Sequence, residues 1–432
     1  MKTALIHKEI LALSIPAIIT NITTPLLGLV DVAITGHMGS AVYIAAIAIG
    51  GSMFNLLYWL FAFLRMGTSG ITAQAYGAKN FDETTLTLIR SLIVSALVGI
   101  FLIALQYPIS HGLMRFLNPD NEVVDIALTY FGIGIWGAPA FLGTFALSGW
   151  FLGMQDSKAA MYVSLVINIT NISTSLVLVY ICNWGIVGVA AGTLISQWLG
   201  FAVGLLLCLN KRYNHHHPHT SDIFDWDKLR RFFSVNIDIF FRTMCLVIVT
   251  LSFIRAGAQQ SSVILAVNTL LMQLFLLFSY FMDGFAFAGE ALAGRFIGER
   301  NNDRLQQCIK ALMLWGALVA VVFTLIYAIG GQGFLSLLSS DLAVIKASKQ
   351  YYLWAAAIPL SGFVAFTWDG IFIGATLTRS LLLSMFLAAV VFFAIYFTTF
   401  DLYGNNALWA AFLSYLIVRG IVLTLCARKV SI

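Results

Sequence analysis

The sequence predicts an all-α polytopic membrane protein with twelve transmembrane helices in two six-helix bundles related by an internal repeat. Three observations predict it: the composition, the recurrence of long apolar stretches, and two motifs that return at one constant offset. The 432 residues are 60% hydrophobic and only 10% charged, whereas a soluble globular domain is nearer a quarter charged. The composition therefore excludes an ordinary soluble protein.

The apolar stretches are roughly 20 residues or longer, enough to cross a hydrocarbon core about 30 Å thick. They lack the period-2 alternation of membrane β-strands, so helices are predicted. Clusters of Gly, Asn, Asp and Pro separate them. The predicted spans are residues 11–36, 44–76, 85–107, 122–153, 158–181, 185–209, 235–256, 262–297, 306–330, 343–376, 380–399 and 405–427.

Two motifs recur at the same separation of 221 residues. SGITAQAYGAKN around Gly77 is similar to EALAGRFIGERN around Gly298, and SGWFLG around Gly149 is similar to DGIFIG around Gly370. Such a repeat indicates two fused homologous halves, which is typical of secondary transporters. The sequence thus predicts an N-terminal six-helix lobe (1–210), a cytoplasmic linker with an amphipathic segment (211–234) and a C-terminal six-helix lobe (235–432).

Lys and Arg residues predict the orientation. Sixteen of them fall on one side of the predicted membrane, and four fall on the other: Arg115, Arg255, Lys346 and Lys349. The positive-inside rule places both termini in the cytoplasm. The net charge of +5 resides largely in these loops and requires no nucleic-acid partner.

Two features of the chain invite a metal or disulfide hypothesis. His215, His216, His217 and His219 lie in the linker, where a solvated loop is favoured over a metal site because metal ligands are usually fixed by a folded shell. The five cysteines are scattered and match neither a disulfide framework nor a zinc pattern. No metal site is predicted.

Asp31 is the clearest polar residue inside a predicted span. A charge at the bilayer centre costs about 2.5–3.5 kcal/mol on insertion scales, so a neutral acid that can exchange a proton is favoured there. Pro16 and Pro25 in the same span remove backbone hydrogen bonds and permit a bend. The alternative is an acid that lies near the helix end and reaches the outer headgroups.

The second half has its own intramembrane acids. Asp283 and Glu290 are seven residues apart and lie on one helix face, and Asp369 lies in a later span. All three are candidates for a cavity or cation site, although Glu290 could equally lie at headgroup level. Arg242 follows Asp238 by four residues, so these two are expected to pair along their helix.

The residues resemble a known family. PLLGLVDVAITGHMG, GITAQAYGAKN, NIDIFFR and WDGIFIGAT are similar to stretches of the multidrug and toxic compound extrusion (MATE) transporters, within them the DinF-like subfamily. The resemblance implies two bundles around a V-shaped cavity that opens alternately to either side of the bacterial inner membrane. It implies a monomer among membrane lipids that exports small lipophilic, often cationic compounds for protons or sodium, without a bound cofactor.

The resemblance also assigns residues. The family's first-helix acid falls on Asp31 and its bending proline on Pro16. The family's Asn-x-x-x-Asp motif falls on Asn171 and Ser175, so a serine replaces the second acid, and a threonine of the same cluster falls on Thr193. A sodium ion needs several oxygens and enough negative charge to offset its dehydration. One carboxylate instead of two favours protons.

The resulting hypothesis is proton-coupled antiport. Protonation of Asp31 would break its hydrogen bonds to Asn171 and Thr193, the first helix would bend at Pro16, and the shrinking cavity would expel the substrate. Sodium-coupled antiport stays open.

Three other function classes are weaker. A flippase for lipid-linked precursors should have a cationic cavity to hold pyrophosphate, whereas the intramembrane charges here are mostly acidic. An intramembrane enzyme would need a nucleophile–base pair, a metal cluster or paired aspartates, and no such motif occurs. A channel is disfavoured by the fused repeat.

Overall fold

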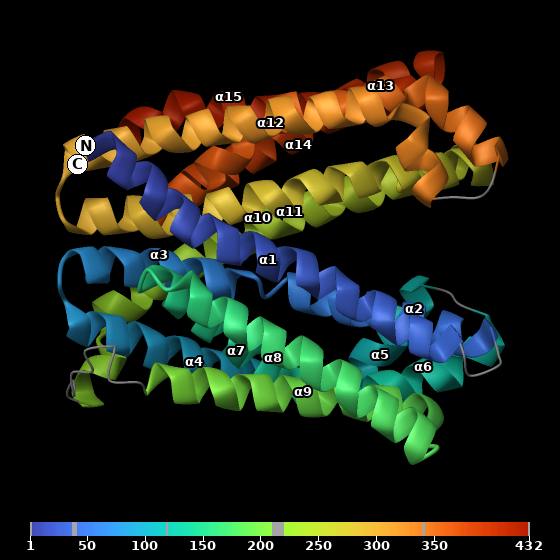
Figure 1. The fold of residues 1–432 in the computed structure, drawn as a ribbon, viewed down its shortest axis with the longest axis horizontal. Helices are drawn as coiled ribbons and strands as arrows, with labels where there is room; N and C mark the ends of the chain where they lie inside the picture. Colours follow the sequence, from blue (N-terminus) through green and yellow to red (C-terminus); the bar gives the residue numbers. More distant parts are fainter. Residues whose placement is uncertain (1, 37–40, 118–119, 210–219, 339–341, 431–432) are drawn as a thin grey trace. The chain divides into compact units, whose positions relative to one another are not determined.

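The computed structural model describes residues 2–36, 41–117, 120–209, 220–338 and 342–430, and within these ranges every regular element is helical (Figure 1). The α-helices of the first half are α1 (Lys2–Gly36), α2 (Ala41–Trp59), α3 (Phe63–Gly77), α4 (Phe81–Ala104), α5 (Gln106–Leu117), α6 (Asn121–Gly134), α7 (Ala138–Gly153), α8 (Ser157–Leu176) and α9 (Gly185–Cys208). Those of the second half are α10 (Trp226–Gln260), α11 (Ser262–Gly298), α12 (Asn302–Leu338), α13 (Leu342–Gly374), α14 (Thr378–Tyr403) and α15 (Asn405–Cys426).

Within the described ranges, twelve helical segments are long and apolar enough to cross a membrane, which confirms the predicted fold class. Two of these segments join two α-helices end to end: α2 with α3, and α6 with α7. The remaining spans are single helices, and α8 continues into a π-helical turn, Val177–Ile181. Each predicted span therefore falls on an observed helical segment, and many of the helices extend beyond the predicted bounds.

The described contacts divide the chain into two compact units. The C-terminal unit comprises Met1–Ile18 and Phe233–Ile432, and the N-terminal unit comprises Ile19–Phe232. These bounds differ from the predicted lobe 1–210, because the first half of α1 groups with the C-terminal residues. Helix α1 is nevertheless continuous from Lys2 to Gly36.

The first half of α1 is held by α11 and α12 inside the C-terminal unit. Glu9 forms an ion pair with Arg304 at 3.4 Å, and Trp315 donates a hydrogen bond to His7 Nδ1 at 3.0 Å. A Cβ built at Gly284 would lie 2.3 Å from Ile18, so this glycine allows the two helices to approach closely.

The predicted linker is described only from Thr220 onward, so the histidine run lies outside the described residues. A 3₁₀ turn, Thr220–Phe224, precedes α10. The amphipathic segment is not a separate helix, because α10 begins at Trp226 and continues into the seventh span. Buried Arg90 fixes the turn by donating to the carbonyl oxygens of Asp222 and Ile223 at 2.5 and 2.9 Å.

The sequence repeat corresponds to a repeated helix contact. In the N-terminal unit, a Cβ at Gly149 would lie 2.3 Å from the carbonyl oxygen of Arg65. In the C-terminal unit, a Cβ at Gly370 would lie 2.0 Å from the carbonyl oxygen of Ala286. Both the glycines and their partners are separated by 221 residues. The repeated glycines are therefore required where α7 packs on α3 and where α13 packs on α11.

The turns follow the same offset. Three pairs of residues with positive φ lie 221 positions apart: Lys79 with Arg300, Gln155 with Thr376, and Asn183 with Gly404. The caps repeat as well, since Asn80 accepts from the amide of Glu83, and Asn301 accepts from the amide of Arg304. The two halves thus share backbone conformation at the ends of their helices.

Replacing Gly370 with alanine is expected to destabilise the fold strongly. Overpacking usually costs about 1–3 kcal/mol, and the upper end applies because the added Cβ meets backbone. The thermal unfolding midpoint of purified protein checks this. Gly132→Ala is the matched control, since no atom lies within 4 Å of its Cβ position. Equal midpoints for the two variants would contradict the close contact.

Candidate functional site

The predicted N-terminal cluster is assembled from three helices. Asp31 lies on α1, Asn171 and Ser175 lie one turn apart on α8, and Thr193 lies on α9. Asn171 Nδ2 donates to Thr193 Oγ1 at 2.9 Å. A Cβ at Gly192 would lie 2.3 Å from Ser175 Oγ, so this glycine brings α9 against α8. The structure therefore joins Asn171, Ser175 and Thr193 in one contact.

The cluster is buried and its hydrogen bonding is incomplete. Asp31 is 6% exposed, and Asn171 and Ser175 are fully buried. Asp31 Oδ1, Asn171 Oδ1 and Ser175 Oγ have no hydrogen-bond partner among the described residues. Buried polar atoms are normally satisfied, because leaving one unpaired costs about 1–3 kcal/mol. Asp31 on α1 and both Asn171 and Ser175 on α8 thus each keep an unpaired buried oxygen within the described part of the chain.

Tyr130 on α6 is a buried neighbour of Asp31. It is 5% exposed and interacts electrostatically with the Asp31 carboxyl. A Cβ at Gly50 would lie 2.4 Å from the Tyr130 ring, so Gly50 on α2 makes room for it. The sequence does not predict Tyr130, because one tyrosine in an aromatic-rich span has no pattern that separates it from packing residues.

The expected direct hydrogen bonds of Asp31 are not found. No described hydrogen bond joins the Asp31 carboxyl to Asn171 or Thr193, and only its backbone oxygen accepts, from Thr35 Oγ1 at 2.9 Å. The Asn171 amide nitrogen and the Thr193 hydroxyl instead pair with each other, and Asp31 interacts electrostatically with Tyr130 on α6.

Asp369 is the acid of the second half that forms a buried ion cluster. Asp369 on α13 accepts from Arg242 Nη2 on α10 and from Arg419 Nη2 on α15, both at 2.5 Å to its Oδ2 atom. Asp369 and Arg242 are 7% exposed and Arg419 is 3% exposed. Arg419 also lies over the rings of Phe366 and Tyr415, at 5.9 and 5.4 Å from their centroids. Two guanidiniums thus neutralise Asp369 and occupy its Oδ2 lone pairs.

Asp283 and Glu290 lie on α11, as expected from their spacing, but in different surroundings. Asp283 is partly buried and interacts electrostatically with Arg419. Glu290 is 1% exposed, so it is enclosed by protein rather than by headgroups. No group of three or more His, Cys, Asp and Glu side chains arranged to hold a metal occurs within the ranges that the structure describes.

The expected pair of Asp238 and Arg242 is wrong. Arg242 turns toward Asp369, while Asp238 Oδ2 accepts from Thr378 Oγ1 at 2.7 Å. The helical spacing allows an Asp238–Arg242 pair, but a carboxylate on another helix competes for the guanidinium. Tertiary contacts therefore override the local pairing.

Known proteins give an independent comparison. The chain matches the MatE family over residues 16–177 and 238–398, one segment in each half. The "DNA damage-inducible protein F" of Escherichia coli (strain K12) is 33% identical over 425 residues, covering 98% of this chain and 92% of that protein. The "Probable multidrug resistance protein NorM" of Photorhabdus laumondii is 24% identical, covering 78% of this chain and 75% of that protein.

The fold is also shared with solved structures. One, described as "Crystal structure of MATE in the bent conformation", has a TM-score of 0.86 at 20% identity, covering 99% of this chain and 96% of that chain. Together with the family match and the relative from E. coli, this confirms the resemblance found in the residues. The chain therefore belongs to the MatE family of multi-pass membrane transporters, the multidrug and toxic compound extrusion transporters, and is not an enzyme.

Proposed function

We propose that the chain is a proton-coupled antiporter that exports lipophilic, often cationic compounds. The observation that carries this proposal is the environment of Asp31. Its carboxyl is buried, one of its oxygens lacks a described partner, and it interacts with Tyr130 in a polar cluster. A buried carboxylate in an apolar membrane helix loses its negative charge when it takes up a proton, which removes the cost of a charge in the membrane.

The composition of the cluster favours a proton over a sodium ion. Asp31 is the carboxylate of the cluster, whereas Ser175, at the position of the family's second acid, adds an oxygen without charge. A sodium ion must replace its hydration shell with several oxygens of sufficient negative charge. Asn171 Oδ1 and Ser175 Oγ supply neutral oxygens, so sodium coupling is the second candidate and is tested beside the first.

Tyr130 offers a route from protonation to conformation. When Asp31 is ionised, its charge attracts the Tyr130 hydroxyl proton; when it is neutral, this attraction is lost. In this proposal the change at Tyr130 on α6 reaches α9, which packs against α6. It then reaches Asn171 on α8, because Asn171 Nδ2 donates to Thr193 Oγ1 on α9.

The bend of α1 follows from Pro16. Proline removes one backbone hydrogen bond inside a helix and clashes with the preceding turn, so the helix is weakest there. Pro16 lies two residues before the end of the segment that groups with the C-terminal unit. Two structural neighbours are described as MATE "in the bent conformation" and "in the straight conformation", and for this chain we propose a bend at Pro16.

The remaining features follow the bacterial relatives. We propose that drug-like compounds are the substrates, that both termini face the cytoplasm of a bacterial inner membrane, and that a monomer among membrane lipids is the working unit. In this proposal the chain transports the coupling ion without a bound cofactor. The orientation rests on the Lys and Arg asymmetry of the loops.

Everted vesicles test the proposal, with efflux of a lipophilic cationic dye driven separately by a proton gradient and by a sodium gradient. The wild type is expected to respond to the proton gradient alone. Pro16→Ala is expected to fold and to transport more slowly under the same gradient, because it restores the missing backbone hydrogen bond. Efflux driven by sodium alone would overturn proton coupling, and unchanged efflux by Pro16→Ala would overturn the bend.

A further inference from the structure

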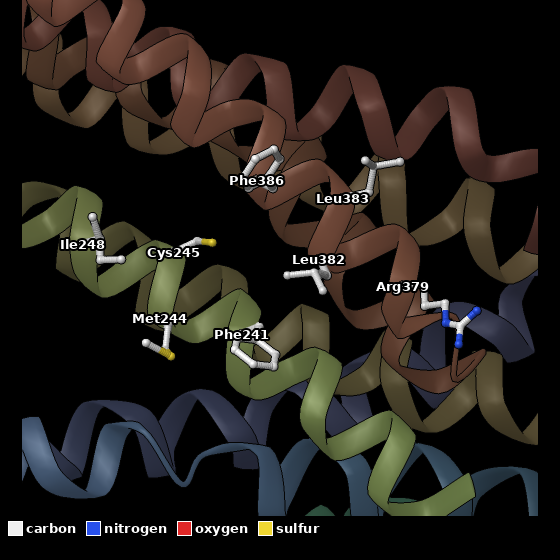
Figure 2. Close-up of a pocket in the computed structure, with 8 residues that line it drawn as sticks. All are labelled: Phe241, Met244, Cys245, Ile248, Arg379, Leu382, Leu383 and Phe386. Carbon is white, nitrogen blue, oxygen red and sulfur yellow. The ribbon is translucent and has the colours of Figure 1, made fainter.

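A pocket of about 540 Å³ lies between α10 and α14 in the C-terminal unit (Figure 2). Four residues of α10 line it, and their spacing of i, i+3, i+4 and i+7 defines one helix face: Phe241, Met244, Cys245 and Ile248. Four residues of α14 line it at the same spacing: Arg379, Leu382, Leu383 and Phe386. Each helix thus contributes two turns of one face, about 10 Å in length.

The pocket is apolar and open at its side. Phe241, Ile248, Leu383 and Phe386 are between 45% and 55% exposed. All four lie within candidate membrane spans. Large side chains exposed at this depth are solvated by hydrocarbon and not by water. The pocket therefore fits a flexible hydrocarbon chain.

The charge in the pocket is confined to one end. Arg379 lies in the first turn of α14, and Figure 2 shows it at the opposite end of the pocket from Ile248. Its side chain is exposed, and none of the described ion pairs or hydrogen bonds involves it. The helix dipole adds positive potential at this end. Nearby Asp238 accepts from Thr378, which ties α14 to α10 at the same end.

We propose that this pocket binds an anionic phospholipid, with one acyl chain between α10 and α14 and the headgroup phosphate on Arg379. The charge pattern carries the choice of occupant: the apolar length suits an acyl chain, and the guanidinium matches a phosphate. The Lys and Arg asymmetry places Arg379 on the cytoplasmic side, where anionic lipids attract basic residues. A lipophilic cation fits the pocket less well, because Arg379 repels it.

Native mass spectrometry of the purified full chain tests this, after exchange into equal amounts of phosphatidylglycerol and phosphatidylethanolamine. The wild type should retain phosphatidylglycerol over phosphatidylethanolamine by about fivefold, the effect of one basic residue near a membrane surface. Arg379→Gln should lose this preference. Leu383→Trp, which fills the pocket, should lose retained lipid of both kinds. Lys310→Gln, which removes an exposed charge on α12, is the control and should behave as the wild type.

Alkylation of Cys245 provides a second measurement, which does not require the Leu383→Trp variant to fold. Its thiol lines the pocket, so a bound acyl chain should slow its alkylation by a membrane-permeant maleimide, measured on its own peptide. Phosphatidylglycerol should protect Cys245 in the wild type and in Lys310→Gln, and less in Arg379→Gln. Protection by a cationic dye but by neither lipid would make the pocket a drug site and overturn the proposal. Equal loss of protection in Lys310→Gln and Arg379→Gln would show that general surface charge explains it, and would overturn the proposed role of Arg379.

Discussion

Asp31→Asn is expected to reduce proton-driven efflux to the level of vesicles without the protein. Asparagine has nearly the same shape but cannot take up or release a proton, so the polar cluster keeps its packing and loses its titratable group. Asp31 is buried and interacts with Tyr130, and no other carboxylate belongs to the cluster as the structure describes it. The measurement is dye efflux from everted vesicles under an imposed proton gradient.

The control for Asp31→Asn is Asp125→Asn, which changes an exposed aspartate on α6 of the same unit. This variant should keep wild-type efflux. Thermal unfolding separates coupling from folding, because Asp31→Asn should unfold no earlier than the wild type once a buried ionisable group has been removed. Proton-driven efflux that survives in Asp31→Asn would show that the coupling proton is carried elsewhere.

Asp369→Asn is expected to destabilise the C-terminal unit by about 3–5 kcal/mol, the usual cost of breaking a buried ion pair. Asp369 accepts from both Arg242 and Arg419. Removing its charge leaves two buried guanidiniums without their shared carboxylate. The thermal or denaturant unfolding of purified protein measures the loss, and Asp401→Asn, an exposed change on α14, should have no such effect.

A combined variant identifies the cause of that loss. Asp369→Asn together with Arg242→Met and Arg419→Met removes all three charges, and buried ion clusters replaced by apolar side chains are often neutral or more stable. Stability should therefore recover relative to Asp369→Asn alone. If the single variant is as stable as the wild type, the Asp369 cluster is not a structural anchor, and a role as a second ion-coupling site becomes the better explanation.

Asp31 and Asp369 show how two residues of the same type differ in their surroundings. Both are intramembrane acids in the sequence, and both are buried in the structure. Asp31 lies near the Tyr130 side chain, whereas Asp369 accepts hydrogen bonds from Arg242 and Arg419. The difference between the two aspartates lies in partners that are distant in sequence.

The sequence predicted the scaffold in detail because local properties determine it. A bilayer requires long apolar helices whose backbone groups are satisfied internally, so the twelve spans follow from hydropathy alone. The 221-residue offset was visible in two motifs, and the structure explains it through Gly149 and Gly370, where a side chain would meet a neighbouring backbone. Glycine at a helix contact is a local requirement, so it survives as a sequence signal.

What the sequence determined by itself is therefore the fold class, the repeat, and the identity of Asp31, Asn171, Ser175 and Thr193 as candidates. Only the tertiary structure decided that Asn171 pairs with Thr193, and that Arg242 binds Asp369 in place of Asp238. The physical reason is that hydropathy and helix spacing act along one helix. The partner of a buried polar group is chosen among side chains from several helices, and one sequence does not reveal which of them meet.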